Sequence, residues 1–362
     1  LQTNRTEYIA TYLDTLHRQA QQLSPLTAGL TFDSFAIGGG TPLLLTVPQL
    51  EQLMATAALF GVHPSHAFTS VETSPEYADR PRLNVLKKAG VSRVSIGIQS
   101  FQDEELKAIK RRPRQNTIYQ ALDDIRQMDF PYFNIDLIYG IKGQTVESFL
   151  YSLEEALRFQ PNELFIYPLY VRQGTGITER EPDDVCFRMY RAACKLLQAK
   201  GFLQTSMRRF IHHPSTDAEV SCGDEVMLSC GSGGRSYLGD LHYATRYTVC
   251  QQCIAREIDE YMATTDFTVA RNGFILSAKE QQQRFIIKNL MYYMGIDKAE
   301  YTRRFGEPLD RTPLFRQLAE QYWIEETPER IRLTPEGLGY SDYIGQLFIT
   351  PEIRQLMETY SY

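Results

Sequence analysis

Residues able to bind a small charged ligand recur where predicted strands end. The segment Gly38–Pro42 (GGGTP) follows the first apolar run, and Glu72, Gln99 and Asp136 lie in or at the ends of later ones. A basic run occupies Lys110–Arg112. Consecutive glycines let a backbone approach a ligand closely. A carboxylate pairs with an ammonium or with ribose hydroxyls, and an arginine holds a carboxylate through two hydrogen bonds. A zwitterionic amino acid joined to a nucleoside would satisfy all of these groups.

Each of these features also has a purely structural interpretation. An isolated triple glycine is typical of a tight turn between a strand and a helix. The loop lacks the lysine and hydroxyl residue of a P-loop and the spaced glycines of a dinucleotide fingerprint. Glu72, Gln99 and Asp136 each fit a solvated strand end. Their joint placement on one rim is what favours a binding site.

The elements that would position these residues alternate along the first half of the chain. After a helix at 8–23, apolar runs of strand character alternate with segments of helical periodicity. The predicted strands are 32–37, 67–72, 93–99, 133–139 and 164–170, and the predicted helices are 50–59, 83–88, 118–128 and 146–159. This alternation predicts an α/β fold with parallel strands joined by right-handed crossovers. In such a barrel, ligand-binding residues gather where strands end and loops begin.

The pattern changes in the second half. A helix at 183–200 and a strand at 202–210 are followed by glycine-rich loops with short strands at 221–247. The C-terminal part has predicted helices at 278–293 and 314–323, a strand at 331–333, and an N-cap at 334–337 that opens a last helix. We therefore divide the chain into a partial barrel at 1–200, a barrel extension at 201–270, and a helical, winged-helix-like domain at 271–362.

Composition excludes several classes of protein. The 362 residues are 43% hydrophobic and 23% charged, as in an ordinary globular chain. No run approaches the ~18 apolar residues of a membrane span. With 38 basic and 44 acidic residues the net charge is −6, which argues against nucleic acid or a membrane surface as partner. Six cysteines are too few for a disulfide framework and favour a reducing, cytoplasmic location.

Several motifs carry a resemblance to a known family. They are GGGTP at 38–42, SIGIQSF at 95–101, NIDLIYG at 134–140, KGQT at 142–145, ELFIYPLY at 163–170, GSGGRSY at 231–237 and RLTPEGL at 332–338. Together they resemble the radical S-adenosylmethionine (SAM) family of oxygen-independent coproporphyrinogen III oxidase (HemN/HemW-like). Its relatives include haem-chaperone-like proteins and class C radical methyltransferases. The resemblance implies a partial (β/α)6 TIM-like barrel with a C-terminal helical domain.

The resemblance also implies roles for individual residues. Gly38, Gly39, Gly40 and Thr41 would meet the methionyl amino group of SAM, and Pro42 would shape the loop. Glu72, Gln99 and Arg112 would contact the amino-acid and ribose parts, and Asp136 would take the ribose hydroxyls. Arg111 is a near rival for Arg112, because a Lys-Arg-Arg-Pro run stands where relatives show one arginine.

The cysteines of the family's cofactor are not found in this sequence. The resemblance implies a [4Fe–4S] cluster held by a C-x3-C-x2-C triplet, with one iron open to SAM. This chain has no such triplet, and we expect the triplet upstream of Leu1; a naturally cluster-free relative is the alternative. Cys250 and Cys253 form the closest cysteine pair. A second metal site built from them, with Cys222, Cys230, His212 and His213 nearby in the chain, is a weaker hypothesis.

The family divides into three outcomes. The first is oxidative decarboxylation of porphyrinogen propionates, the second is methyl transfer with two SAM molecules, and the third is haem binding and delivery without turnover. Expected partners are a small-molecule substrate such as a tetrapyrrole, or else a peptide, and a reductant such as flavodoxin or ferredoxin. The sequence alone leaves the three outcomes open.

Overall fold

The computed structural model describes most of the chain. The described residues are 6–62, 67–112, 114–172, 176–212, 226–245, 251–309 and 312–359. Of the residues named above, Cys222, His213 and Cys250 lie outside this set.

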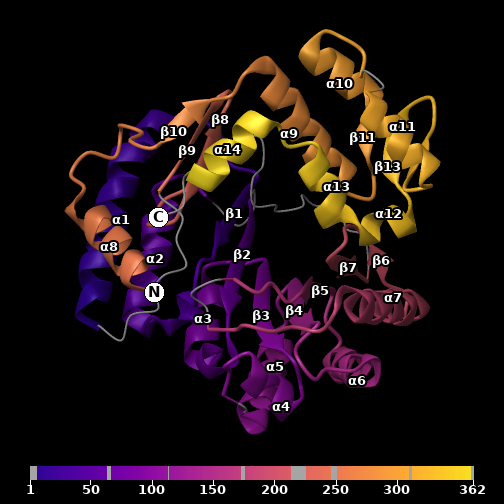
Figure 1. The fold of residues 1–362 in the computed structure, drawn as a ribbon. Helices are drawn as coiled ribbons and strands as arrows, with labels where there is room; N and C mark the ends of the chain where they lie inside the picture. Colours follow the sequence, from indigo (N-terminus) through magenta and orange to yellow (C-terminus); the bar gives the residue numbers. More distant parts are fainter. Residues whose placement is uncertain are drawn as a thin grey trace.

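A curved sheet forms the centre of the N-terminal part (Figure 1). Its parallel strands are β1 (Ser34–Ile37), β2 (Phe68–Thr73), β3 (Arg93–Gln99), β4 (Tyr132–Tyr139) and β5 (Glu163–Pro168). They lie side by side in chain order, and each pairs in parallel with the next. Sequential order of parallel strands is the arrangement of a (β/α) barrel. The predicted α/β fold with a partial barrel is thereby confirmed.

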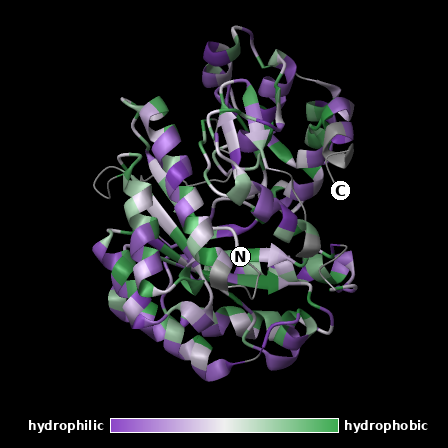
Figure 2. Cartoon of the chain, turned by 90° about the vertical axis from the view of Figure 1, so that its left-hand side faces the viewer, coloured by the Kyte–Doolittle hydropathy of each residue, from purple (hydrophilic) through white to green (hydrophobic). Residues whose placement is uncertain are grey.

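Helices cover the outside of this sheet. They are α1 (Thr6–Leu23), α2 (Val47–Ala58), α3 (Arg80–Lys88), α4 (Asp103–Ala108), α5 (Gln115–Met128), α6 (Val146–Leu157) and α7 (Asp183–Ala199). Local signals start several of them: Asp79 accepts the Arg82 amide at the beginning of α3, and Thr145 accepts the Ser148 amide at the beginning of α6. Helices in Figure 2 show both hydrophobic and hydrophilic residues, as expected when one face is buried.

The main core lies between the sheet and these helices. Ile96, Ile135, Leu137 and Phe149 are fully buried there. Burial of each such side chain contributes about 1.5–3 kcal/mol relative to exposure. Because side chains alternate along a strand, residues 93, 95 and 97 of β3 and residues 134 and 136 of β4 occupy the opposite face. The core thus fixes which face of the sheet is left for polar residues.

The predicted strand at 202–210 is wrong as a single element. The segment forms two short strands, β6 (Leu203–Gln204) and β7 (Arg209–Ile211), which pair antiparallel at the far edge of the sheet. The Ser206 hydroxyl accepts hydrogen bonds from the amides of Arg208 and Arg209 at 3.3 and 3.2 Å, and these bonds close the turn. A serine side chain that satisfies nearby amides is a standard way to turn the backbone.

A second, smaller sheet follows. Its strands are β8 (Arg235–Leu238), β9 (Leu241–Ala244) and β10 (Gly273–Ile275), and helix α8 (Gln251–Ala263) lies between β9 and β10 in the chain. The sequence analysis assigned no element to α8. This region docks on α1, because the Arg18 guanidinium donates to the Met262 and Thr264 carbonyls at 3.3 and 2.8 Å.

The C-terminal part has its own hydrophobic core. Its elements are α9 (Ala278–Leu290), β11 (Ile296–Asp297), α10 (Lys298–Phe305), α11 (Pro313–Glu320), β12 (Ile324–Glu326), β13 (Arg330–Leu333), α12 (Pro335–Gly339), α13 (Ser341–Leu347) and α14 (Pro351–Thr359). The predicted N-cap is confirmed, since Thr334 accepts the Gly337 amide at 3.0 Å. These orange and yellow elements gather above the barrel in Figure 1.

The C-terminal part packs directly on the barrel. The Tyr293 amide donates to the Thr205 carbonyl at 2.8 Å, and the rings of Phe187 and Tyr340 stack with centroids 5.0 Å apart. No helix among the described residues combines the length and apolarity needed to cross a bilayer.

Candidate functional site

The polar face of the sheet brings several predicted residues to neighbouring positions. In the strand register, Glu72 lies beside Ser95, and Ser95 lies beside Asn134. One step further along the strands, Gly97 lies beside Asp136. We call the set Glu72, Ser95, Gln99, Asn134 and Asp136 the strand-end cluster. It is built from β2, β3 and β4, so three separate segments of sequence must fold together to form it.

Glu72 packs against the glycine loop that follows β1. The Gly39 amide donates to Glu72 Oε2 at 3.3 Å. Gly39 and Gly40 have φ values of 82° and 103°, which favour glycine. Burial on the protein side raises the pKa of Glu72, while the Gly39 amide and the positive charge of Arg93 oppose that rise. The carboxylate stays exposed on its other side and is therefore available to a cationic group.

Thr41 and Pro42 turn the chain out of this loop. Thr41 has an extended backbone, and Pro42 begins a short 3-10 helix, η2 (Pro42–Leu44). The Leu44 amide donates to the Thr41 carbonyl at 2.9 Å. Both residues therefore shape the loop in which the glycines present their backbone groups.

Gln99 reaches the cluster through an irregularity in β3. The register with β4 shifts between Gly97 and Gln99, and Gln99 has a φ of 73°. Its side chain folds back over Gly97, so closely that a Cβ at position 97 would collide with the Gln99 amide. The absence of a side chain at Gly97 is thus what lets the Gln99 side chain lie over Gly97, the residue that pairs with Asp136 in the register.

Asp136 is held by two polar neighbours. Asn134 Nδ2 donates to Asp136 Oδ1 at 2.7 Å, and the Ser95 hydroxyl donates to Asp136 Oδ2 at 3.5 Å. Burial raises the pKa of Asp136 to about 7; the Asn134 hydrogen bond opposes this rise and the nearby Glu72 charge adds to it. An aspartate that titrates near neutrality changes its charge within the physiological pH range.

Asn134 has a spare acceptor. Its Oδ1 atom is buried and has no hydrogen-bond partner among the described residues. Asn134 Nδ2 also donates to Ser95 Oγ at 2.7 Å, so the amide orientation is fixed by two donated bonds. A buried acceptor without a partner costs free energy. A ligand with hydroxyl or amino donors would remove that cost.

A buried ion triad flanks the cluster on the same sheet, since Glu163 pairs with Asn134 in the register of β4 and β5. Glu163 accepts from Arg93 at 3.1 Å and from Arg209, and the side chain of Glu163 is 2% exposed. Arg93 also donates to Ser70 Oγ at 2.9 Å. The positive charge of Arg93 partly opposes the rise that burial causes in the pKa of Glu72 and of Asp136.

The structure records no contact between the remaining predicted site residues and the cluster among the described residues. Arg111 and Arg112 are exposed after α4, and Arg112 forms no hydrogen bond or ion pair within the described part of the chain. Its contact with SAM stays a prediction. Cys253 lies half-buried on α8, while its proposed partner Cys250 lies outside the described residues. A search of the described residues finds no cluster of three or more metal-ligating side chains.

Sequence reasoning missed the residues that support the predicted ones. Arg93, Ser95 and Gly97 alternate along β3, and Asn134 stands two residues before Asp136. This period of two was the available signal, because it places all five residues on one face of the sheet. Glu163 and Arg209 had no comparable signal, since their meeting depends on how β5 pairs with β7.

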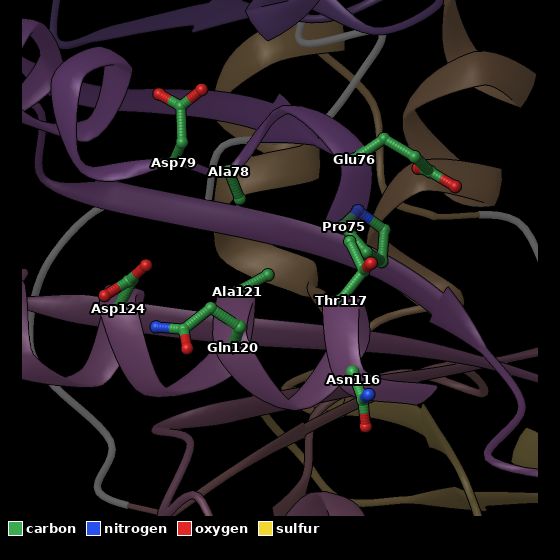
Figure 3. Close-up of a pocket in the computed structure, with 9 residues that line it drawn as sticks. All are labelled: Pro75, Glu76, Ala78, Asp79, Asn116, Thr117, Gln120, Ala121 and Asp124. Atoms are coloured by element: carbon green, nitrogen blue, oxygen red, sulfur yellow. The ribbon is translucent and has the colours of Figure 1, made fainter. Parts of the chain in front are cut away.

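A surface pocket lies elsewhere and involves none of these residues. Figure 3 shows it between the loop after β2 and helix α5, lined in part by Glu76, Asp79 and Asp124. Asp79 is bound to Arg82, and Asp124 accepts from Arg80 Nε at 2.7 Å. Its two paired carboxylates thus serve helix packing, and we assign the pocket no function.

Comparisons with known proteins agree with this architecture. The sequence model of the radical SAM superfamily matches residues 13–156, and that of the HemN C-terminal domain matches residues 276–339. Among solved structures, coproporphyrinogen III oxidase (HemN) from Escherichia coli superposes with a TM-score of 0.79. The two chains are 23% identical, and the match covers 96% of this chain and 85% of that one. This likeness shows the fold of a radical SAM protein.

Sequence relatives define the family more closely. Oxygen-independent coproporphyrinogen III oxidase of Salmonella typhimurium is 31% identical over 360 residues, which cover 90% of this chain and 76% of the relative. Heme chaperone HemW of Bacillus subtilis is 26% identical over 355 residues, which cover 93% and 92%. The chain therefore belongs to the HemN/HemW-like family of radical SAM proteins, and the predicted family is confirmed.

The family implies SAM and a [4Fe–4S] cluster, and the two fit this chain differently. The strand-end cluster suits SAM for two reasons. The Glu72 carboxylate is exposed and can bind an ammonium. Asn134 Oδ1 has no hydrogen-bond donor among the described residues, and it lies beside the carboxylate of Asp136, so the two can accept hydrogen bonds from hydroxyls. The iron–sulfur cluster requires three thiolates close together. The described residues provide no such set. The strand-end cluster therefore fits SAM, whereas the described residues do not supply the ligands of the iron–sulfur cluster.

Proposed function

We propose that this chain is the SAM-binding and substrate-covering part of a radical SAM enzyme that acts on a tetrapyrrole. The observation that carries the proposal is the strand-end cluster, which gathers Glu72, Gln99 and Asp136 beside the glycine loop. SAM held there would be the source of the radical with which a radical SAM enzyme takes a hydrogen atom from its substrate, and a [4Fe–4S] cluster would supply the electron.

The role of each residue in holding SAM follows from its charge and place. Glu72 would bind the methionyl ammonium, and the glycine loop would hold it with backbone groups. Asp136 would accept hydrogen bonds from the ribose hydroxyls, with Asn134 Oδ1 as a second acceptor beside it. Gln99 would donate to or accept from the same part of the ligand. Fixing SAM in one orientation and excluding water is the contribution that these residues make to the reaction.

The substrate class rests on the relatives. Oxygen-independent coproporphyrinogen III oxidases and heme chaperones are both named for tetrapyrroles. By analogy we propose a tetrapyrrole substrate, with an electron donor of the flavodoxin or ferredoxin type. The division into three domains drawn from the sequence, with boundaries near residues 200 and 270, remains part of this proposal.

Binding of SAM to the protein tests the proposal directly. We expect Glu72→Ala and Asp136→Ala each to weaken SAM at least about tenfold in isothermal titration calorimetry, corresponding to ~1.4 kcal/mol. Glu76→Ala is the matched control, because Glu76 is an exposed carboxylate four residues beyond Glu72. Wild-type affinity in both site variants would refute the placement of SAM.

Turnover is tested separately. A preparation that contains the cluster, reduced without oxygen, should release 5′-deoxyadenosine from SAM and convert coproporphyrinogen III. Release of S-adenosylhomocysteine alongside 5′-deoxyadenosine would point to methyl transfer instead of decarboxylation.

Haem delivery without turnover is the second candidate. It is favoured by the match to heme chaperone HemW of Bacillus subtilis, which spans 92% of that relative, compared with 76% of the Salmonella oxidase. Under this alternative, haemin should give a stable Soret band with the protein, and no SAM should be consumed. Consumption of SAM coupled to loss of coproporphyrinogen III would exclude it.

A further inference from the structure

Two donors from the barrel meet a carboxylate from the C-terminal part. The Arg208 guanidinium binds Asp342 Oδ1, and the Tyr170 hydroxyl donates to Asp342 Oδ2. Arg208 also donates to the Tyr170 oxygen at 2.6 Å, which fixes the two donors relative to each other. Both oxygens of one carboxylate are thus gripped by a rigid pair, as in the recognition of a bound carboxylate ligand.

This pair lies on the same edge of the barrel as the strand-end cluster. Tyr170 follows β5 just as the glycine loop follows β1, and Arg208 immediately precedes β7. Tyr167 in β5 lies near both groups, because the charges of Asp136, Glu72 and Arg208 all act on the pKa of its hydroxyl. A substrate held over the strand-end cluster would therefore have Arg208 and Tyr170 at its side.

The surroundings of the pair are basic. The guanidinium carbons of Arg172 and Arg208 each lie 5.9 Å from the Tyr170 ring centroid. Two guanidinium groups on one phenol ring make a site that favours anions.

The Arg208–Asp342 contact is also accessible. The side chains are 33% and 38% exposed, whereas Glu163 in the buried triad is 2% exposed. Exchange of a carboxylate partner inside the triad would leave a charged group buried without its ion-pair partner. At Arg208 the released Asp342 can return to water, and an exposed ion pair contributes little to stability. Of the two, the exposed pair is therefore the one that can exchange partners readily.

We propose that Arg208 and Tyr170 form a carboxylate-binding subsite for the substrate, and that Asp342 occupies it until a substrate carboxylate displaces Asp342. This inference rests on the proposed function, because it requires a substrate with carboxylates, as the propionates of a tetrapyrrole are. Asp342 belongs to α13, so substrate binding at the subsite would release a contact between the C-terminal part and the barrel.

The test compares variants on the two sides of the pair, with coproporphyrin III as the probe in a fluorescence titration. Asp342→Asn removes the competing charge and should tighten coproporphyrin III several-fold. Arg208→Gln should weaken it about tenfold, and Tyr170→Phe should weaken it by a smaller factor. The tetramethyl ester of the same porphyrin should respond to neither Asp342→Asn nor Arg208→Gln.

Glu336→Gln is the matched control. It breaks another ion pair between the barrel and the C-terminal part, Arg191–Glu336 at 3.2 Å, on the outer helix α7. Its coproporphyrin III affinity should equal that of the wild type. Arg208→Lys, which keeps the charge, should retain part of the affinity and so separates loss of the ligand contact from loss of folding.

If Asp342→Asn and Arg208→Gln changed the affinity for coproporphyrin III in the same direction, the proposal would be overturned. Both substitutions break the Arg208–Asp342 ion pair, so a contact with a purely structural role would give the same effect in both variants. An equal response of acid and ester, or no binding of coproporphyrin III to the wild type, would overturn it too. SAM affinity measured in the same variants should not change. Failure of SAM to bind the wild-type protein would count against the proposed function and not against the subsite.

Discussion

Gly38 and Glu72 lie so close together that no side chain fits between them. A Cβ at position 38 would come within 2.9 Å of Cδ and Oε1 of Glu72. Neighbouring Gly39 donates its amide to the same carboxylate at 3.3 Å. The first glycine of the loop thus provides space and the second provides a hydrogen bond. The position of Glu72 therefore depends on the loop as much as on its own strand.

Gly38→Ala should weaken SAM binding about tenfold, ~1.4 kcal/mol, because the new methyl group would push the Glu72 carboxylate out of place. Isothermal titration calorimetry gives the affinity. Gly61→Ala serves as the control: Gly61 has a φ of 66°, has open space around a Cβ, and lies far from the loop in sequence. That variant should lose about 1 kcal/mol of stability and keep its SAM affinity. Equal SAM affinity in Gly38→Ala and the wild type would contradict the tight Gly38–Glu72 contact.

SAM affinity should rise with pH through about 7. Burial raises the pKa of Asp136 to about 7, so its carboxyl is protonated below that pH and ionised above it. The ionised form is the better acceptor for ribose hydroxyls. Titrations between pH 5.5 and 8.5 should therefore show tighter binding at the alkaline end. Asp136→Asn should bind SAM weakly with an almost flat profile, and a pronounced pH dependence in this variant would assign the effect to another group.

The same shift predicts how Asp136 affects stability without ligand. The pKa of Asp136 is raised from 3.8 to about 7 on folding, so the unfolded chain loses its proton first as the pH rises. The contribution of Asp136 to stability should therefore decline between about pH 4 and pH 7. Asp136→Asn removes this decline, and thermal melts should show a higher Tm than the wild type at pH 8 with little difference at pH 4. A lower Tm than the wild type at pH 8 would argue against a raised pKa.

Glu163→Gln should destabilise the protein by about 3–5 kcal/mol, because Arg93 and Arg209 would lose the buried carboxylate that lies between them. Urea denaturation measures the change in the free energy of unfolding. In contrast, Glu104→Gln removes an ion pair with Lys107 in which both side chains are more than half exposed. That control should change stability by less than about 0.5 kcal/mol. Similar effects of the two substitutions would mean that the triad is open to water.

The glutamine of KGQT should be structural. Gln144 Nε2 donates to Glu105 Oε2 at 2.9 Å and to the Ile138 carbonyl at 3.2 Å, and Gln144 Oε1 accepts from the Ile141 amide at 3.2 Å. Gln144→Ala should cost about 2–3 kcal/mol of stability in urea denaturation. SAM affinity should be nearly unchanged under conditions where the variant is folded. An exposed glutamine on α5, Gln120, offers the comparison, since Gln120→Ala should affect neither quantity.

The parallel strands were predictable from sequence for a local reason. Runs such as 93–99 and 133–139 are apolar and β-branched, and the structure places β3 at Arg93–Gln99 and β4 at Tyr132–Tyr139. The segment 202–210 has a similar composition but contains Thr205 and Ser206. The Ser206 side chain turns the backbone, and this effect depends on which amides it meets. A propensity argument could not separate one strand from two.

Within the site, the types of residue were predictable and their neighbours were not. Glu72, Gln99 and Asp136 were predicted from their places on the strands. The fold-back of Gln99 over Gly97 depends on a register shift that no local pattern reveals. The contact of Arg208 and Tyr170 with Asp342 joins residues more than 130 positions apart.

The sequence by itself determined the alternation of strands and helices, the family, and the residue types able to hold a zwitterionic nucleoside. Periodicity and strand ends are local properties, so they can be read along the chain. Tertiary structure alone decided which charges meet: Glu163 with Arg93 and Arg209, and Asp342 with Arg208. Charge pairing and pKa values depend on the distance between groups and on their burial, and neither quantity can be inferred from their separation along the sequence.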